Sequence, residues 1–177
     1  EPTPITVSTT PTNLLCNGIT PPNGSALVTA SGGTGNLGFL WDAGTGNQAT
    51  ANATGLAPGI YTVTVTDDSL CTSSSSVTIT EPSAVTATII NSVNVNCFGD
   101  NSGTATVSGS GGTGGTYNFL WSDAQTSAQA IGLLAGSYTV TVSDSNNCSS
   151  ITTITITEPA TAISGIINID TIVGCFN

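Results

Sequence analysis

The chain has 177 residues, ten acidic side chains and no Lys, Arg or His, which gives a formal net charge of −10. Because no side chain can neutralise phosphate, this composition excludes nucleic acid and anionic membranes as electrostatic partners. It leaves no cleavage site for trypsin-like proteases and no side-chain base that titrates near neutral pH, which argues against an enzyme. Hydrophobic residues make up 38% of the chain, enough to build a core rather than a disordered segment.

The chain repeats itself with a period of 77 residues. Asp67, Cys71 and Glu81-Pro82 return as Asp144, Cys148 and Glu158-Pro159. Self-similarity at this spacing predicts an array of small modules. We therefore expect one module at residues 1–80, a second at 81–157, and the first strand and start of an incomplete third at 158–177.

Each module shows the period-two alternation of β-strands. Small residues alternate at 26–30, a short apolar strand ends at Trp41, and Thr alternates with apolar residues over 61–67 and again over 77–80. The second copy repeats these strands, and Asn, Asp, Ser and Gly mark the turns between them. About seven short strands fit in each copy, which predicts tandem antiparallel β-sandwiches of the immunoglobulin-like type.

Four aromatic residues are expected in the cores. Trp41 and Trp121 end apolar strands, where a sandwich commonly buries one large aromatic side chain. Tyr61 and Tyr138 follow Leu-x-x-Gly-x segments and resemble tyrosine corners, in which the phenol bonds to upstream backbone. An alternative is that the two Trp faces are platforms for sugar rings.

The cysteines indicate an oxidising, extracellular compartment. Two fall at matching positions in each copy, which predicts one disulfide per module, Cys16–Cys71 and Cys97–Cys148. Each would close a loop of about 50 residues near one end of its sandwich. Cys175 matches Cys97 and lacks a mate in this segment.

The order of these motifs resembles the SprB-type repeat of Bacteroidetes cell-surface proteins. The resemblance rests on Cys, then Gly-Gly-Thr-Gly, Trp, Gly-Leu-x-x-Gly-x-Tyr-Thr-Val-Thr-Val, Asp-x-x-x-Cys and Thr-Ile-Thr-Glu-Pro, in both copies. The first copy departs at 19–22 with a longer loop. The resemblance implies a secreted surface adhesin or filament of the gliding type, with no catalytic residues to transfer.

Two further kinds of site are open at this stage. Asp67, Asp68, Asp100 and Asp144 offer oxygen ligands for calcium, although Asp commonly occurs in such turns without metal. Asp67-Asp68 is also the one adjacent carboxylate pair, and its copy does not keep it. Ser69 and Thr171 lie in Asp-Ser/Thr-apolar triplets that resemble acceptors of Bacteroidetes O-glycosylation.

The sequence therefore predicts a structural and adhesive protein, part of an extracellular filament or surface fibre whose partners are neighbouring repeats or copies of itself. Polymerisation by strand sharing is one version, with Ile163, Ile166, Ile167, Ile169 and Ile172 on the donor strand. The alternative is a carbohydrate-binding array that holds surface glycans. No cofactor is expected, and no segment is long and apolar enough to insert into a membrane.

Overall fold

The computed structural model describes residues 2–160 and confirms an all-β chain of two sandwiches. The first contains a single turn of 3₁₀ helix and six strands, β1 (Thr6–Thr12), β2 (Gly24–Ser31), β3 (Leu37–Trp41), β4 (Asn52–Leu56), β5 (Gly59–Asp67) and β6 (Thr72–Ile79). The second contains β7 (Ser83–Val93), β8 (Gly103–Gly112), β9 (Asn118–Trp121), β10 (Gln129–Leu133), β11 (Gly136–Ser143) and β12 (Ser149–Ile156).

Both sandwiches have the strand order of an immunoglobulin-like fold. One sheet of the first is ordered β1-β2-β4 and the other β3-β5-β6. The second repeats this as β7-β8-β10 and β9-β11-β12, and every pairing is antiparallel. Each described module has six strands instead of about seven, because only a loop and, in the first, the short helix Ala43–Thr45 separate the third strand from the fourth.

Strict alternation explains the buried face of β5. Tyr61, Val63 and Val65 are buried, while the Thr residues between them are partly exposed. Thr suits this position because its branched side chain favours strand geometry and its hydroxyl meets water. The equivalent strand β11 buries Val140 and Val142. A shift of one residue in either strand would turn this apolar set to solvent, so the pattern also specifies the register.

The predicted aromatic core positions are confirmed for both Trp residues and for Tyr61, while Tyr138 is partly buried. The phenols close tyrosine corners, Tyr61 donating to the Ala57 carbonyl at 2.9 Å and Tyr138 to the Leu134 carbonyl at 3.2 Å. Each module has its own apolar cluster around its Trp. Because truncating a buried Trp costs about 3–5 kcal/mol, these clusters dominate the stability of the modules.

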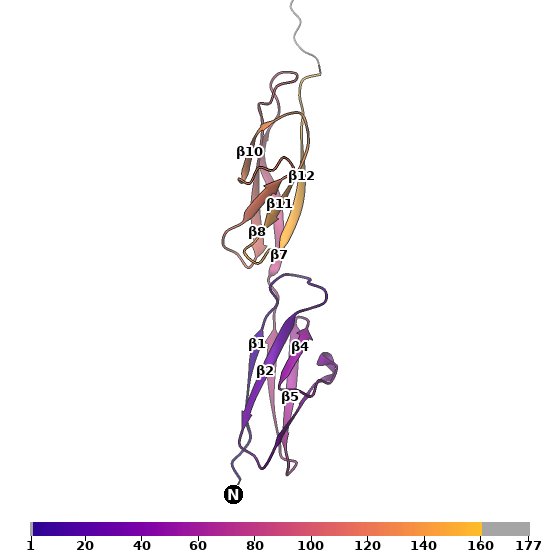
Figure 1. Ribbon diagram of the computed structural model, residues 1–177, viewed down its shortest axis with the longest axis vertical. Coiled ribbons are helices and arrows are strands. Elements are labelled where there is room, and N and C mark those ends of the chain that lie inside the picture. Colours follow the sequence, from indigo (N-terminus) through magenta and orange to yellow (C-terminus); the bar gives the residue numbers. More distant parts are fainter. Residues whose placement is uncertain (1, 161–177) are drawn as a thin grey trace, which may run out of the picture.

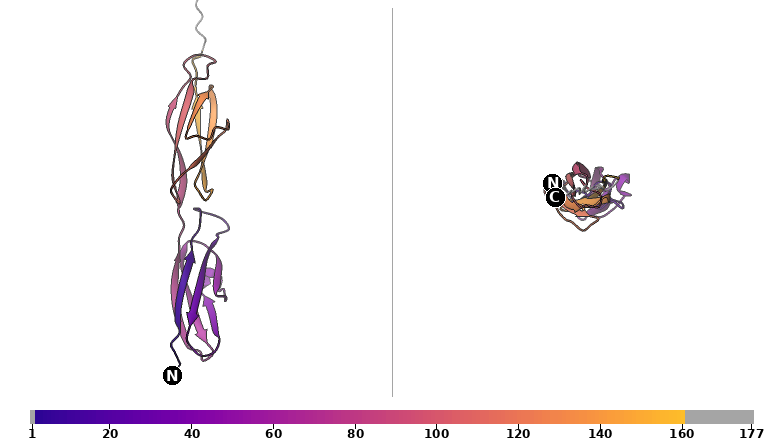
Figure 2. Two further views of the ribbon diagram at one scale, coloured as in Figure 1. Left: turned by 60° about the vertical axis from the view of Figure 1, so that its left-hand side comes forward. Right: turned by 90° about the horizontal axis from the view of Figure 1, so that it is seen from above.

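The two modules lie end to end along one axis (Figures 1 and 2). The view down that axis in Figure 2 superimposes one module on the other. Only residues 80–82 separate β6 from β7, so the chain passes directly from the last strand of one module to the first of the next. Proline at position 82 fixes its own φ and favours an extended residue before it.

Candidate functional site

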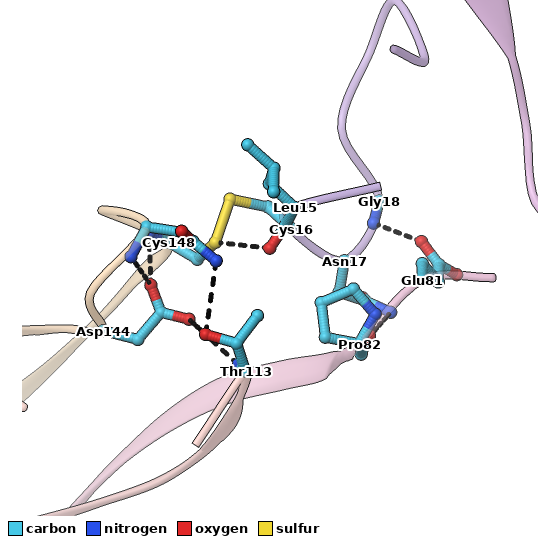
Figure 3. Close-up of a disulfide and its surroundings, with 10 residues drawn as sticks. Leu15, Cys16, Asn17, Gly18, Glu81, Pro82, Thr113, Asp144 and Cys148 are labelled. Carbon is cyan, nitrogen blue, oxygen red and sulfur yellow. Dashed lines mark hydrogen bonds between the residues drawn. A yellow bond between two sulfur atoms is a disulfide. The ribbon is translucent and has the colours of Figure 1, made fainter. Parts of the chain in front are cut away.

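The module junction is covalently closed by a disulfide between Cys16 and Cys148 (Figure 3). The bridge joins residues 132 apart in sequence, one from each module, with Cα atoms 5.5 Å apart. The predicted pairs Cys16–Cys71 and Cys97–Cys148 are therefore wrong. Cys71 and Cys97 are exposed free thiols.

Strand length explains why the cysteines do not pair within a module. Cys71 directly precedes β6, and the loop that carries Cys16 lies beyond the other end of that strand, where the Leu14 N–H donates to the Thr80 carbonyl at 3.0 Å. Eight residues of strand at about 3.3 Å each put the two cysteines some 25 Å or more apart. A disulfide needs Cα atoms within about 7 Å, so an intramodule bridge cannot form.

Three contacts hold the Cys16 loop at the junction. The Asn13 side-chain oxygen accepts from the Thr80 N–H at 2.9 Å, and the Glu81 carboxylate accepts from the Gly18 N–H at 2.8 Å. The Asn17 amide donates to the Pro82 carbonyl at 3.2 Å. The Glu-Pro segment, which the sequence showed only as a repeated motif, therefore anchors the loop that presents the cysteine.

Cys148 lies in the β11–β12 turn, which the Asp144 carboxylate organises. One carboxylate oxygen accepts from the N–H groups of Asn146 at 2.9 Å and Cys148 at 3.0 Å. The other accepts from the N–H and the hydroxyl of Thr113, both at 3.1 Å (Figure 3). This carboxylate therefore ties the cysteine turn to the Gly-Gly-Thr-Gly loop.

These hydrogen bonds lower the pKa of Asp144. The Thr113 N–H contributes most to holding the pKa of Asp144 below its ordinary value, against the opposing effect of burial. Asp67 has the same arrangement in the first module, and the Thr34 N–H is the main cause of its lowered pKa. Both aspartates are buried and ionised, so they act as structural acceptors in their turns.

The Gly-Gly-Thr-Gly loops are shaped by close approach, a role that sequence reasoning missed. Gly111 has a φ of +77°, and a Cβ there would collide with the Ala84 carbonyl of β7. At Gly112 a Cβ would lie 2.5 Å from the Asp144 carboxylate. Positive φ values and absent side chains are both needed here, which explains paired glycines. The recurrence of Gly-Gly-Thr-Gly in both copies was the sequence feature from which this role could have been inferred.

The disulfide lies against a small cavity between the modules. Its lining comes from the Cys16 loop, the start of β7 and the β11–β12 turn, namely Cys16, Asn17, Ile19, Ala84, Val85, Cys148 and Ser149. The Cys148 sulfur also lies 3.1 Å from the Leu15 carbonyl (Figure 3). A bridged sulfur has no proton to donate, so this is a close contact rather than a hydrogen bond.

The four calcium candidates do not converge. Asp67 and Asp144 direct their oxygens at backbone N–H groups, Asp68 accepts from Asn36, and Asp100 accepts from the N–H of Asn101. Among residues 2–160, no cluster of three His, Cys, Asp or Glu side chains could hold a metal ion. Oxygens that already accept N–H bonds are poor ligands, and the calcium prediction has no preformed site in this part of the chain.

The two Trp side chains are buried and cannot serve as the sugar-binding platforms that the alternative requires. Trp41 and Trp121 are 0% and 2% exposed, and their indole N–H groups donate to the carbonyls of Thr50 at 3.0 Å and Ser127 at 2.9 Å. A ring buried on both faces cannot stack on a sugar. The Asp67-Asp68 pair is likewise divided between two turn networks rather than directed at one reacting atom.

The remaining predicted sites are the glycosylation residues, Cys175 and the donor strand. Ser69 is exposed in the turn before Cys71, where a glycan could be attached, and its modification stays a prediction. Thr171, Cys175 and the isoleucines of the predicted donor strand lie outside the described residues. No helix in residues 2–160 is long and apolar enough to cross a membrane.

Comparison with known proteins gives one family. The SprB repeat matches residues 8–46 and 89–126, segments that each contain a first cysteine, a Gly-Gly-Thr-Gly loop and the core Trp. No curated relative matches the chain.

Solved structures with a similar arrangement include a 282-residue C-terminal fragment of intimin in complex with the intimin-binding domain of the translocated intimin receptor. It is 17% identical with a TM-score of 0.43, and the match covers 86% of this chain and 64% of that fragment. Murine CEACAM1b is 15% identical over 88% of this chain and 100% of that one, with a TM-score of 0.32. The two immunoglobulin domains of DIP-gamma are 11% identical over 77% and 88%, with a TM-score of 0.31.

Proposed function

Since the chain carries two SprB-type repeats of immunoglobulin-like fold, we propose that it is a stiff segment of an extracellular surface fibre, the stalk of an adhesin-type repeat protein. The observation that carries this proposal is the disulfide across the module junction. A bridge within each module would stabilise folding only. A bridge between modules resists bending and twisting of one module against the next.

The rest of the junction supports the same role. The connecting segment is three residues long, contains Pro82 and is bonded to the Cys16 loop through Glu81. Domains joined by flexible linkers move independently by default. Here a short linker, a side-chain anchor and a covalent bridge act together, so the modules extend in one direction as a rod.

The composition suits exposure outside the cell. A surface without Lys or Arg gives trypsin-like proteases nothing to cut, and disulfides persist in oxidising surroundings. The net charge of −10 keeps neighbouring fibres apart through like-charge repulsion. In this proposal the partners of each module are the adjacent modules, and the protein has no catalytic activity.

The test compares the angle between modules in the oxidised and bridge-free proteins. Negative-stain electron microscopy and small-angle X-ray scattering of the 177-residue chain should show straight two-module particles with a narrow angular distribution. The variant Cys16→Ser, which keeps both cores, should bend over a wider range. Equally broad distributions in the oxidised and variant proteins would contradict a rod and favour flexible beads that tether an adhesin tip.

Strand sharing is a finer version of the fibre proposal. It uses the segment after residue 160 as a donor strand for another subunit, which is a known route to polymers. Light scattering on a chain whose third module has been completed separates the two versions. Concentration-dependent growth would support strand exchange, and a monodisperse monomer would leave tandem modules in one chain as the basis of the fibre.

A further inference from the structure

We propose that Cys97 and Cys71 are halves of two further junction bridges, so that disulfides run along the whole array. Cys97 joins the second cysteine of a following module, and Cys71 joins the first cysteine of a preceding one. The partner at each end is another SprB-type module docked as the second module docks on the first. The inference rests on the proposed function, since it requires modules on both sides.

The loop of Cys97 is anchored in the same way as the loop of Cys16. The Asn94 side chain accepts from the Thr157 N–H at 3.0 Å, as Asn13 does from Thr80. The Val95 N–H donates to the Thr157 carbonyl at 2.9 Å, and the Gly99 N–H donates to the Glu158 carboxylate at 2.6 Å. Cys97 is therefore held at the outer end of the second module in the position from which Cys16 forms its bridge.

The turn of Cys71 is built in the same way as the turn of Cys148. The Cys71 N–H donates to the Asp67 carboxylate at 2.8 Å, and the Asp67 N–H donates to the Cys71 carbonyl at 3.0 Å. The other Asp67 oxygen accepts from the Thr34 N–H of the Gly-Gly-Thr-Gly loop at 2.8 Å. Cys71 is thus presented at the N-terminal end of the first module, as Cys148 is at the N-terminal end of the second.

Apolar side chains flank the two free thiols. Phe98 follows Cys97 and is 53% exposed, and Leu70 precedes Cys71 and is 82% exposed. The equivalent positions beside the closed bridge are Asn17 and Asn147. Single exposed apolar residues are common on monomers. Here they coincide with the two unbridged cysteines, and the equivalent Asn17 lines the cavity of the closed junction while its side chain stays exposed.

The two free thiols, Cys71 and Cys97, cannot form a disulfide with each other within one chain. Cys71 lies at the N-terminal end of the first module and Cys97 at the C-terminal end of the second, so the length of the two-module rod separates them. Each bridge instead forms between neighbouring modules. Two thiols lose two electrons and two protons to an oxidant, such as a small-molecule disulfide, which is reduced to two thiols. One cysteine thiolate first attacks the small-molecule disulfide, which breaks its S–S bond, forms a mixed disulfide and releases one small thiolate. The other cysteine thiolate then attacks the protein sulfur of the mixed disulfide, which forms the Cys–Cys bond and releases the second small thiolate.

The first test adds a preceding module to the complete chain. Residues 1–80 carrying Cys71→Ser are placed before residue 1, so that Glu1-Pro2 occupies the position of Glu81-Pro82 and Cys71 occurs once in the extended chain. After oxidation with oxidised glutathione, the added Cys16 should be bridged to Cys71, and the original Cys16–Cys148 bridge should remain. Mass spectrometry of peptic fragments identifies the pairs, because trypsin has no site in this chain. A Cys71 that remains a free thiol after oxidation, with the Cys16–Cys148 bridge intact, would overturn the proposal.

The second test addresses the other end. A chain made of residues 1–159 followed by 83–157, with Cys97→Ser in the added copy only, adds a following module after Glu158-Pro159, and the original Cys97 should pair with the added copy of Cys148. Iodoacetamide without denaturant should label Cys97 fully in the original chain and at least tenfold less in the extended one. Continued full labelling of Cys97, with the added Trp buried by fluorescence, would overturn the proposal.

The matched control adds Cys97→Ser at the original Cys97 of the extended chain. It should free the added Cys148 for labelling and leave the Cys16–Cys148 bridge untouched. These outcomes are separate from the bending measurement on the 177-residue chain. Rods whose outer cysteines never pair would refute only the continuous bridging, whereas flexible particles would refute the proposed function.

Discussion

The Cys16–Cys148 bridge should prevent a force applied at the two ends of the chain from extending most of its residues. When the protein is stretched from its two ends, tension passes from Cys16 through the disulfide to Cys148. The 132 residues of separation between them, which include nearly all of both cores, stay outside the force path. We therefore expect the oxidised protein to resist extension even after its outermost strands have detached.

The magnitude follows from the sequence separation. A fully extended chain spans about 3.3–3.6 Å per residue, so release of the bridge should add about 440–475 Å of contour length. Reduction should also lower the free energy of unfolding, by about 5 kcal/mol in the chain-entropy model for a loop of this size. An intramodule bridge would instead release a loop of about 50 residues from each module.

Single-molecule force spectroscopy measures this difference directly. The 177-residue chain is pulled before and after reduction, and Cys148→Ser is pulled without reductant. The variant should show the full contour length from the start. Cys97→Ser is the matched control, because it removes an exposed free thiol and should retain the short extension. Equal contour lengths in the oxidised and reduced proteins would refute the expectation that tension passes through the disulfide.

Three other predictions follow from the junction and its turns. Gly111→Ala should cost several kcal/mol in a denaturant melt, because its Cβ would meet the Ala84 backbone, whereas Gly114→Ala has the same φ of +77° in open space and should cost about 1 kcal/mol; equal losses would refute the packing argument. Because the pKa values of Asp67 and Asp144 are lowered on folding, their ionised carboxylates should contribute fully to the free energy of unfolding above the ordinary pKa near 3.8, and this contribution should be lost as pH falls through the lower folded values. In thermal melts between pH 2 and 5, the double Asp→Asn variant should show a weaker dependence of Tm on pH. A pH dependence equal to that of the unmodified protein would count against this role. Calorimetry with millimolar calcium should show no binding heat, since the turn carboxylates already accept N–H bonds, and a saturable heat would restore the metal site.

Much of each module could be predicted from local sequence. Alternating Thr and Val in β5 and β11 specify a half-buried strand, because side chains point to opposite faces at a period of two. The Gly-x-Tyr segments specified tyrosine corners, and the apolar strands ending at Trp41 and Trp121 placed the core. These features depend on neighbours within a few residues, so they can be read without knowing the rest of the fold.

The turn networks were only partly foreseen. Asp67 and Asp144 were recognised as turn residues, but their bonds to Thr34 and Thr113 join segments more than thirty residues apart. The same holds for Glu81, whose role with Gly18 needs the last strand of the module to end beside its first loop. Such contacts are set by the order of strands in the sheets, which local patterns do not encode.

The sequence by itself determined that this protein is a string of disulfide-forming β-sandwich modules, because the repeat, the strand period and the paired cysteines are all written in it. Only the tertiary structure decided which cysteines meet. Strand β6 places Cys71 and the Cys16 loop at opposite ends of one sandwich, while end-to-end docking brings Cys16 to Cys148. A disulfide forms between atoms that are close in space, and the stacking of the modules makes residues 132 apart the nearest pair.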